Sequence, residues 1–411
     1  MRRARRALAT GLLLFLLLPL RLAGQAPGDE LEVALLTVGP GERTWEKFGH
    51  NAIVIVDRAA GRARSYNYGL FDFRQENFLL RFVQGRMWYS MGSRSAQREI
   101  DMYTRADRTV VFQRLRLTAA QRAALRDFLA WNDTDGRRNY YYDYYRDNCS
   151  TRVRDALDRA LGGALRQRFD SVTTAHSYRW HTARLTSSQP LLYAGLMVAM
   201  GRPIDAPITA WEEMFLPARL AGRLREVTVP DADGRPVPLV AGEETVHASA
   251  RYVEPEQPAS LVLPFLALGT LLGVGLWLAG RSRGVARRLF TVLATGWSAF
   301  AGIGGLFLLA TWSFTDHVVA RQNASVLLLA PLSLVLAWLL PGAVTSRRRR
   351  VGAAVGTALL VLGLAALALV THVWPGLRQP NLELVALVLP LHVGTLAGLL
   401  AATAPRHGAV E

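Results

Sequence analysis

The amino-acid sequence predicts two parts of different fold class, an α+β domain followed by an all-α membrane domain of five helices. The 411 residues are 51% hydrophobic, with a mean hydropathy of +0.15, which is too apolar for an ordinary soluble enzyme. The apolar residues concentrate in five segments after residue 258, whereas residues 26–255 alternate between apolar and polar stretches. The proline- and acid-rich stretch "YVEPEQP" at 252–258 separates the two parts.

The N-terminus has the pattern of an export signal. Four arginines among the first six residues precede an apolar stretch at 7–20, and small residues follow at 23–24. A basic region, an apolar core and a small-residue site are typical of a secretory signal. We therefore expect a signal peptide or an uncleaved signal anchor at 1–24, and a domain at 26–255 that lies outside the cytoplasm.

The second part is predicted to cross a membrane five times, within residues 259–403. The apolar segments lie at 259–280, 289–312, 324–340, 351–373 and 384–402. Most approach the roughly 20 residues that a spanning helix needs. The third is short and contains Pro331, which makes it the weakest of the five.

The loops between these segments predict the orientation of the chain. The strongly basic loops at 281–288 and 346–350 should face the cytoplasm. The intervening loops at 313–323 and 374–383 then face outward, and residues 404–411 form a cytoplasmic tail. This topology places the soluble domain outside the cytoplasm, on the outer side of the membrane that the five helices cross.

The distribution of charge argues against a nucleic-acid partner. The whole chain has a formal net charge of +16, but residues 25–255 contain 32 Arg and Lys against 28 Asp and Glu. Most of the excess therefore lies near the N-terminus and in the loops between apolar segments. Arginine in those places sets membrane topology, and it does not form a nucleic-acid footprint.

Within the soluble domain, the residue patterns predict four strands and two helices. The strands are expected at 31–40, 51–57, 62–73 and 109–117, where apolar and β-branched residues cluster between turn residues. Thr118 and Gln121 form a capping box that starts a helix at 118–133. A second helix is expected at 150–163, with Ser150 as its N-cap and a Gly-Gly pair at its end.

Cys149 is the only cysteine in the chain, and it directly precedes the second predicted helix. The positive end of a helix and its free backbone N–H groups stabilise a thiolate and can also hold an oxyanion. The alternative is a buried, inert thiol, because cysteine is among the most buried residue types. The polar neighbours in "DNCSTR" make this a poor core segment, which favours a reactive thiol.

A nucleophilic thiol needs a base, and the sequence offers two candidates. His50 opens a predicted strand directly after Gly49 in "KFGHNAIVIVD". His176 and His181 follow the cysteine in "TTAHSYRWH", in the chain order of papain-like proteases. The residues alone leave both possibilities open.

Several of these segments together resemble a known family. The series "FGHNAIVI", "YNYGLFDF", "NFLLRFVQGRMWY" and "YYYDYYRDNCSTRVRD" resembles the periplasmic domain of the bacterial lipoprotein N-acyltransferase family Lnb. The order of histidine first and asparagine-cysteine later is similar to that of circularly permuted papain-like thiol acyltransferases. The resemblance implies a permuted papain-like fold for the α+β domain, and it covers roughly residues 30 to 240.

The resemblance also implies roles for individual residues. Cys149 would be the nucleophile and His50 the base, with Asn67 as the candidate third residue and Asp72 behind it. Asn148 and Ser150 would support the site or help to hold an oxyanion. No cofactor and no metal are expected.

The outward loop at 313–323 contains Asp316, His317 and Asn323 at the expected membrane interface. These residues either cap two helices or hold the polar end of a substrate. The tyrosine-rich run at 140–145 is expected to lie near lipid headgroups. His392 lies inside the fifth apolar segment and needs a polar partner, which the sequence does not identify.

The resemblance implies a lipoprotein N-acyltransferase that uses a Cys149 thioester. The acyl donor would be a phospholipid, and the acceptor a diacylated lipoprotein with a free N-terminal amine. Two alternatives remain from the residues alone. One is a thiol amidase or peptidase that acts on cell-wall peptides, and the other is a membrane receptor or scaffold without enzymatic activity.

Overall fold

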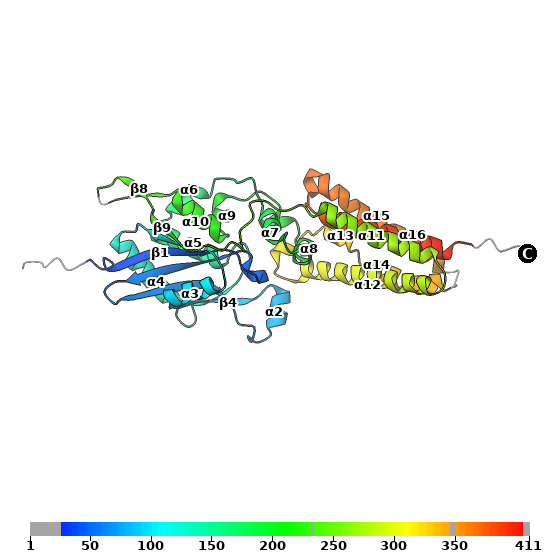
Figure 1. Cartoon of the computed structure of the whole chain (residues 1–411), viewed down its shortest axis with the longest axis horizontal. Helices are drawn as coiled ribbons and strands as arrows, with labels where there is room; N and C mark the ends of the chain where they lie inside the picture. The colour runs from blue at the N-terminus through cyan, green and yellow to red at the C-terminus, as the bar shows by residue number, and fades with distance from the viewer. Residues whose placement is uncertain (1–25, 232, 346–349, 406–411) are drawn as a thin grey trace, which may run out of the picture.

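The computed structural model describes residues 26–231, 233–345 and 350–405. The predicted signal at 1–24 lies outside the described residues. The chain forms two parts that follow one another along the long axis of the molecule, a sheet-containing part and a bundle of apolar helices (Figure 1). This architecture confirms the coarse prediction of a sheet-containing domain followed by five apolar helices.

The soluble part is built on a seven-stranded sheet with the order β6-β4-β3-β2-β1-β5-β9, and every neighbouring pair is antiparallel. The strands are β1 (Leu31–Val38), β2 (His50–Asp57), β3 (Arg62–Leu70), β4 (Trp88–Ser95), β5 (Val110–Leu115), β6 (Asn139–Tyr141) and β9 (Val240–His247). The central strands are buried on both faces, because helices cover the sheet on each side.

Successive side chains of β1 point to opposite faces of the sheet. Val33 and Leu35 pack in a core shared with α4 (Ala119–Asn132) and α5 (Cys149–Ala160). Ala34 and Leu36 point to the other face, toward α3 (Ala96–Arg105). The sheet therefore holds α5 and α3 on opposite sides.

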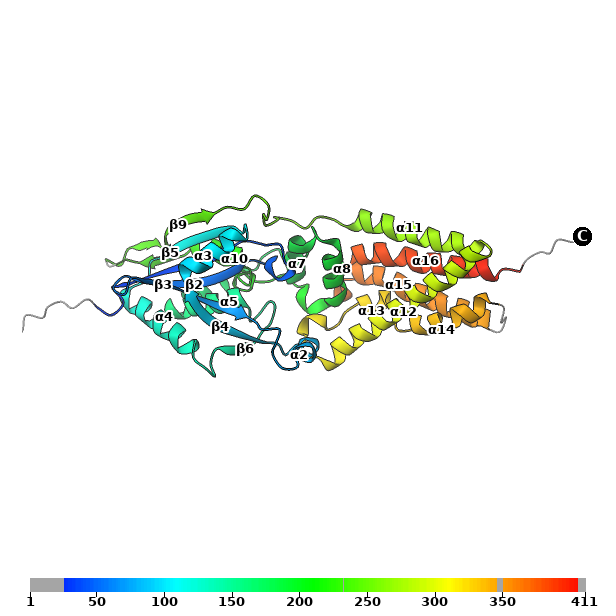
Figure 2. The same cartoon turned by 60° about the horizontal axis from the view of Figure 1, so that its bottom comes forward.

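Several shorter elements complete the soluble part. They are α2 (Phe78–Gln84), α6 (Ala164–Phe169), α7 (Tyr178–Thr186), α8 (Pro190–Ala199), α9 (Ala210–Glu213), α10 (Pro217–Arg225), η2 (Thr44–Glu46), η3 (Arg202–Ile204) and the hairpin β7 (Thr228–Pro230) and β8 (Pro236–Pro238). Helices α7 and α8 lie between the sheet and the bundle (Figure 2).

The described chain contains five spans that are long and apolar enough to cross a membrane. They are α11 (Val262–Arg281), α12 (Val285–Phe314), the pair α13 (Ser325–Leu328) and α14 (Ser333–Val344), α15 (Val351–Val373) and α16 (Leu382–Thr403). The third span is interrupted before α14, around Pro331, which cannot donate a backbone hydrogen bond. His392 Nε2 lies 2.9 Å from the carbonyl oxygen of Leu328 at this interruption, so the partner of the buried histidine is a backbone group that the break leaves free.

The outward loops contact the soluble part directly. The backbone N–H of Gly201 donates to the carbonyl of Val319 at 2.7 Å, and Gln379 Nε2 donates to the carbonyl of Met200 at 3.2 Å. Two further 3₁₀ turns, η4 (Val318–Ala320) and η6 (Pro375–Leu377), lie in these loops. The loops predicted to face outward therefore lie on the same side of the bundle as the soluble part.

Candidate active site

Asn148 starts the helix that carries Cys149. Its backbone is extended, and its Oδ1 accepts hydrogen bonds from the N–H groups of Ser150 and Thr151, both at 2.9 Å. Thr151 Oγ1 accepts from the Asn148 N–H at 2.7 Å and completes a capping box. The prediction that Ser150 is the N-cap is wrong by two positions, because the helix begins at Cys149 and Ser150 lies in its first turn, where its own N–H is capped by Asn148.

The Asn148 side chain has no hydrogen left for an oxyanion. Its Nδ2 donates to the carbonyls of Tyr144 and Phe215, both at 3.0 Å. Ser150 is also fully buried, and its hydroxyl lies 2.7 Å from the Met214 carbonyl and 2.9 Å from Asn51 Oδ1. Both side chains therefore support the turn around Cys149 and are not free to hold an oxyanion.

Replacement of Asn148 by alanine is expected to destabilise the soluble part by about 2 kcal/mol, because its cap bonds and its buried amide bonds are lost together. The apparent Tm of the purified protein measures this change. The matched control is Thr118→Ala, which removes the exposed cap of α4 and should cost about 1 kcal/mol or less. Equal losses in the two variants would contradict the role of Asn148.

His50 is the first residue of β2, and two features of the chain direct it toward the thiol. Gly49 has a left-handed backbone with φ +78°, and a Cβ there would lie 2.7 Å from the Val38 carbonyl oxygen. The His50 Nε2 lies 2.8 Å from Asn67 Oδ1, and the imidazole is close enough to Cys149 for each group to shift the pKa of the other. Because Nε2 faces Asn67, Nδ1 is the nitrogen available to the thiol.

Both groups are partly buried, and each changes the acidity of the other. Burial alone would raise the pKa of Cys149, but His50 and the backbone N–H groups of Asn51 and Ser150 lower it below the ordinary value. Burial would lower the pKa of His50, whereas Cys149, Asn67 and Glu99 raise it. The two shifts favour a thiolate paired with an imidazolium.

Glu99 holds Asn67 from behind. Asn67 Nδ2 donates to Glu99 Oε2 at 2.8 Å, and Ser65 Oγ donates to the same oxygen. A carboxylate accepts only, so the amide of Asn67 must turn its Nδ2 to Glu99 and its Oδ1 to His50. His50 then carries its proton on Nε2 and leaves Nδ1 free to accept the thiol proton.

Asp72 does not lie behind Asn67, in contrast to the expectation from the sequence. Asp72 is exposed and pairs with Arg74 in the loop after β3. Glu99 was missed because it lies in the first turn of α3, where an acidic residue normally indicates only a favourable helix start. Its burial on the sheet is a tertiary property.

Gly69 allows Cys149, on one side of the sheet, to approach residues that lie on the other side. The pairing of β3 with β4 shifts between Asn67 and Leu70, and Gly69 has φ +85°. A Cβ at this position would lie 3.3 Å from the Cys149 Cβ. Cys149 from α5 thereby approaches His50 and Asn67, which point toward the side of α3.

The residues predicted at the membrane loop divide into two groups. Asp316 and His317 contact the α2 segment: Asp316 Oδ2 lies 2.5 Å from Arg86 Nε, and His317 Nε2 lies 2.8 Å from the Phe82 carbonyl. Asn323 is only 1% exposed, and its side chain donates to the Val198 carbonyl at 2.7 Å. Its Oδ1 accepts from the N–H of Ser325, the first residue of α13, at 2.9 Å. Asn323 therefore agrees with the helix-capping alternative and not with the substrate-binding one.

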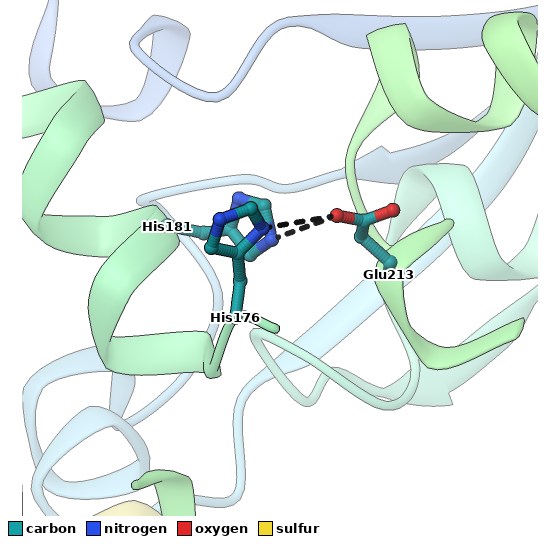
Figure 3. A group of neighbouring side chains, drawn as sticks. All are labelled: His176, His181 and Glu213. Atoms are coloured by element: carbon teal, nitrogen blue, oxygen red, sulfur yellow. Dashed lines mark ion pairs between the residues drawn. The ribbon is translucent and has the colours of Figure 1, made fainter. Parts of the chain in front are cut away.

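The alternative bases His176 and His181 form a separate cluster with Glu213 (Figure 3). Glu213 Oε1 lies 3.2 Å from His181 Nε2 and 3.9 Å from His176 Nδ1. The neighbouring Met214 and Phe215 carbonyls accept from Ser150 and Asn148. The cluster therefore supports the turn around Cys149 from behind.

The chemistry of this cluster favours an ion-pair network over a metal site. Arg184 Nε donates to His181 Nδ1 at 3.1 Å, so the neutral imidazole carries its proton on Nε2, where a metal would have to bind. Burial alone would raise the pKa of Glu213, but His181, Arg219 and Arg223 lower it to about 2. The carboxylate already has cationic partners.

Replacement of Glu213 by glutamine is expected to destabilise the protein at pH 7 by about 3 kcal/mol, because Arg219 and Arg223 lose the buried carboxylate that they pair with. The pKa of Glu213 is lower in the folded protein than its ordinary value of 4.5. The stabilisation is therefore present above about pH 5 and is lost as the pH falls toward 2. The Tm difference between wild type and variant, measured across this range, should shrink on acidification.

The control for this prediction is Glu226→Gln, which removes an exposed carboxylate that pairs with the same Arg223. An exposed ion pair contributes little, so this variant should keep nearly the wild-type Tm. A Tm difference for Glu213→Gln that is independent of pH would contradict the assignment.

The comparisons with known proteins match both parts of the chain. Residues 21–188 match the Lnb N-terminal periplasmic domain, and residues 256–402 match the Lnb transmembrane domain. No curated protein and no solved structure matches the chain.

Proposed function

The chain belongs to the Lnb family, and from this premise we propose that it is a lipoprotein N-acyltransferase with Cys149 as its nucleophile. The family relationship indicates a lipoprotein-modifying protein of the bacterial inner membrane, with a periplasmic soluble domain and multiple membrane spans. The acyl-transfer chemistry, the catalytic roles and the permuted papain-like fold are proposals.

In the first half-reaction, His50 takes the thiol proton, and the thiolate attacks the carbonyl carbon of an acyl ester. A C–S bond forms, and the ester C–O bond breaks. The His50 imidazolium returns its proton to the leaving alkoxide, which departs as an alcohol. Asn148 accepts from the N–H groups of Ser150 and Thr151, so the backbone N–H of Cys149 is the helix-start donor proposed for the developing oxyanion. The donor in this proposal is a phospholipid.

In the second half-reaction, the free α-amine of a diacylated lipoprotein attacks the thioester carbonyl. A C–N bond forms, the C–S bond breaks, and His50 accepts the proton that the amine releases. The products are an N-acylated lipoprotein and the regenerated thiolate and imidazolium pair. Asn67 and Glu99 keep His50 in the orientation that both steps need.

The observation that carries this proposal is the placement of His50 beside Cys149, whose pKa it lowers, with the imidazole held by Asn67 at 2.8 Å in a domain joined to a membrane bundle. A cell-wall amidase would use the same pair with water as the acceptor. The direct contacts between the soluble part and the outward loops favour a substrate that resides in the membrane.

Mass spectrometry of lipoprotein N-termini tests the proposal. A strain that lacks the protein should accumulate lipoproteins with a free N-terminal amine, and wild-type protein but not Cys149→Ser should restore acylation. Unchanged N-termini in the deletion strain would overturn the acyltransferase proposal. Full restoration by Cys149→Ser would overturn the role of the thiol.

A further inference from the structure

Helix α2 exposes apolar side chains that the rest of the described chain does not cover. None of its seven residues is buried, although the sequence "FLLRFVQ" contains five large apolar residues. Leu79 is 72% exposed and Leu80 is 56% exposed, and Phe82 and Val83 are also exposed. Removal of such side chains from water is favourable, so this face is expected to have an apolar partner.

The position of α2 identifies that partner as the lipid bilayer. The Asp316 N–H donates to the Gln84 carbonyl at 2.9 Å, and His317 contacts the Phe82 carbonyl. Both bonds attach α2 to the loop directly after α12, beside the outward end of that helix (Figure 2). Phe314, the last residue of α12, is 85% exposed, so the exposed apolar side chains of α2 continue those of a membrane-spanning helix.

Gly85 makes this attachment close. It ends α2 with φ +76°, and a Cβ at this position would lie 2.9 Å from the backbone nitrogen of His317. Arg86 follows and pairs with Asp316. Helix α2 is therefore held at the membrane end of the soluble part by backbone hydrogen bonds, a close glycine contact and an ion pair.

A ring of aromatic side chains connects α2 to the thiol. We call it the aromatic belt, and each member contacts the next with ring centroids 4.0 to 6.5 Å apart. Its members are Phe71, Tyr89, Tyr142, Tyr144, His317, Phe82, Phe78 and Phe73.

The aromatic belt reaches from the membrane end of the soluble part to the site. Its Tyr142 packs at Gly69, the residue that also contacts Cys149. A recess lies between Tyr142 and His317, lined also by Gly85, Met87 and Tyr144. Aromatic side chains present apolar faces to an acyl chain, while tyrosine hydroxyls tolerate the polar headgroup region.

We propose that α2 is an interfacial helix embedded in the outer leaflet, and that the aromatic belt forms the route of an acyl ester from that leaflet to Cys149. The location of α2 stands on its exposed apolar face and its attachment to α12. The route rests on the proposed acyltransferase function. Two separate measurements therefore test the two statements.

The first measurement locates α2 in phospholipid vesicles. In the full chain with Cys149→Ser, a single cysteine is introduced by Leu79→Cys or Leu80→Cys and labelled with an environment-sensitive fluorophore. Ala60→Cys, in the turn between β2 and β3, is the control, because this turn lies at the opposite end of β2 from His50. Lipids with a nitroxide on the acyl chain should quench the α2 labels at least threefold more than the control.

Equal quenching of the α2 and control labels would overturn the embedded helix. Labels on α2 that are shielded from both lipid quenchers and water-soluble quenchers would overturn it as well, because a protein surface would then cover the helix. Neither result depends on acyl transfer.

The second measurement follows thioester formation on Cys149 from a bilayer phospholipid by intact mass. The double variant Leu79→Glu with Leu80→Glu should lower the rate at least tenfold, while iodoacetamide still alkylates Cys149 at the wild-type rate. Val172→Glu is the matched control, since Val172 is 45% exposed and follows α6, a helix that lies away from the apolar bundle (Figure 1). It should form the thioester at the wild-type rate.

A wild-type rate in the double variant would overturn the route. If wild-type protein forms no thioester from any lipid, the proposed function fails and the route fails with it. The quenching measurement then still decides where α2 lies, so the two failures are distinguishable.

Discussion

Replacement of His50 by alanine is expected to raise the pKa of Cys149 and to slow its alkylation by iodoacetamide at pH 7 at least about tenfold. His50 is the main group that lowers the pKa of the partly buried thiol, and without it the burial that raises the pKa remains. Each unit of pKa above the working pH lowers the thiolate fraction about tenfold. Because Cys149 is the only cysteine, the rate of alkylation across pH reports this thiol alone.

The same variant is expected to reduce acyl transfer by about a thousandfold or more, as is Cys149→Ser, since paired nucleophile and base act as a unit. His247→Ala is the control, because His247 pairs with Asp107 at another edge of the sheet. It should leave the alkylation profile unchanged. A wild-type profile in His50→Ala would show that the thiol and the imidazole do not form the pair.

Replacement of Glu99 by alanine is expected to slow acyl transfer about 10- to 100-fold with little change in KM, because misorientation of the base affects mainly the chemical step. Glu99→Gln retains an acceptor for Asn67 but removes the charge. The charge of Glu99 raises the pKa of His50, so its loss lowers that pKa. The loss of activity at alkaline pH, which follows the loss of the His50 proton, should therefore begin at a lower pH in the variant than in the wild type.

Asp101→Asn on the same helix is the control, because Asp101 contacts Gln97 and lies outside the site. It should leave both the rate and the pH profile unchanged. A Glu99→Gln variant with a wild-type pH profile would restrict Glu99 to a packing role. Glu99 acts through Asn67 and is therefore a positioning residue.

The sequence by itself determined the architecture, because this depends on local and compositional signals. Long apolar stretches predicted the five spanning helices, and basic loops predicted which ends face outward. Thr118 with Gln121 predicted the start of α4, which the structure places at Ala119. Each of these signals lies within a few residues of the element that it specifies.

Elements that depend on distant partners were not predicted from the sequence, or were placed wrongly. Strands β4, β6 and β9 are short or polar, and their pairing across the sheet stabilises them. The break between α13 and α14 was only indicated by Pro331, whereas the bond from His392 to the Leu328 carbonyl required the folded bundle.

At the site, the sequence identified Cys149, His50 and Asn67 as candidates, and only the tertiary structure decided how they meet. Register places Asn67 opposite Ala52, on the face that α3 covers, and so brings Glu99 rather than Asp72 behind it. Hydrogen-bond partners and burial are set by packing between distant segments, and no pattern along the chain encodes them locally. The physical reason is that a side chain's acidity depends on all the groups around it, and these come together only in the folded protein.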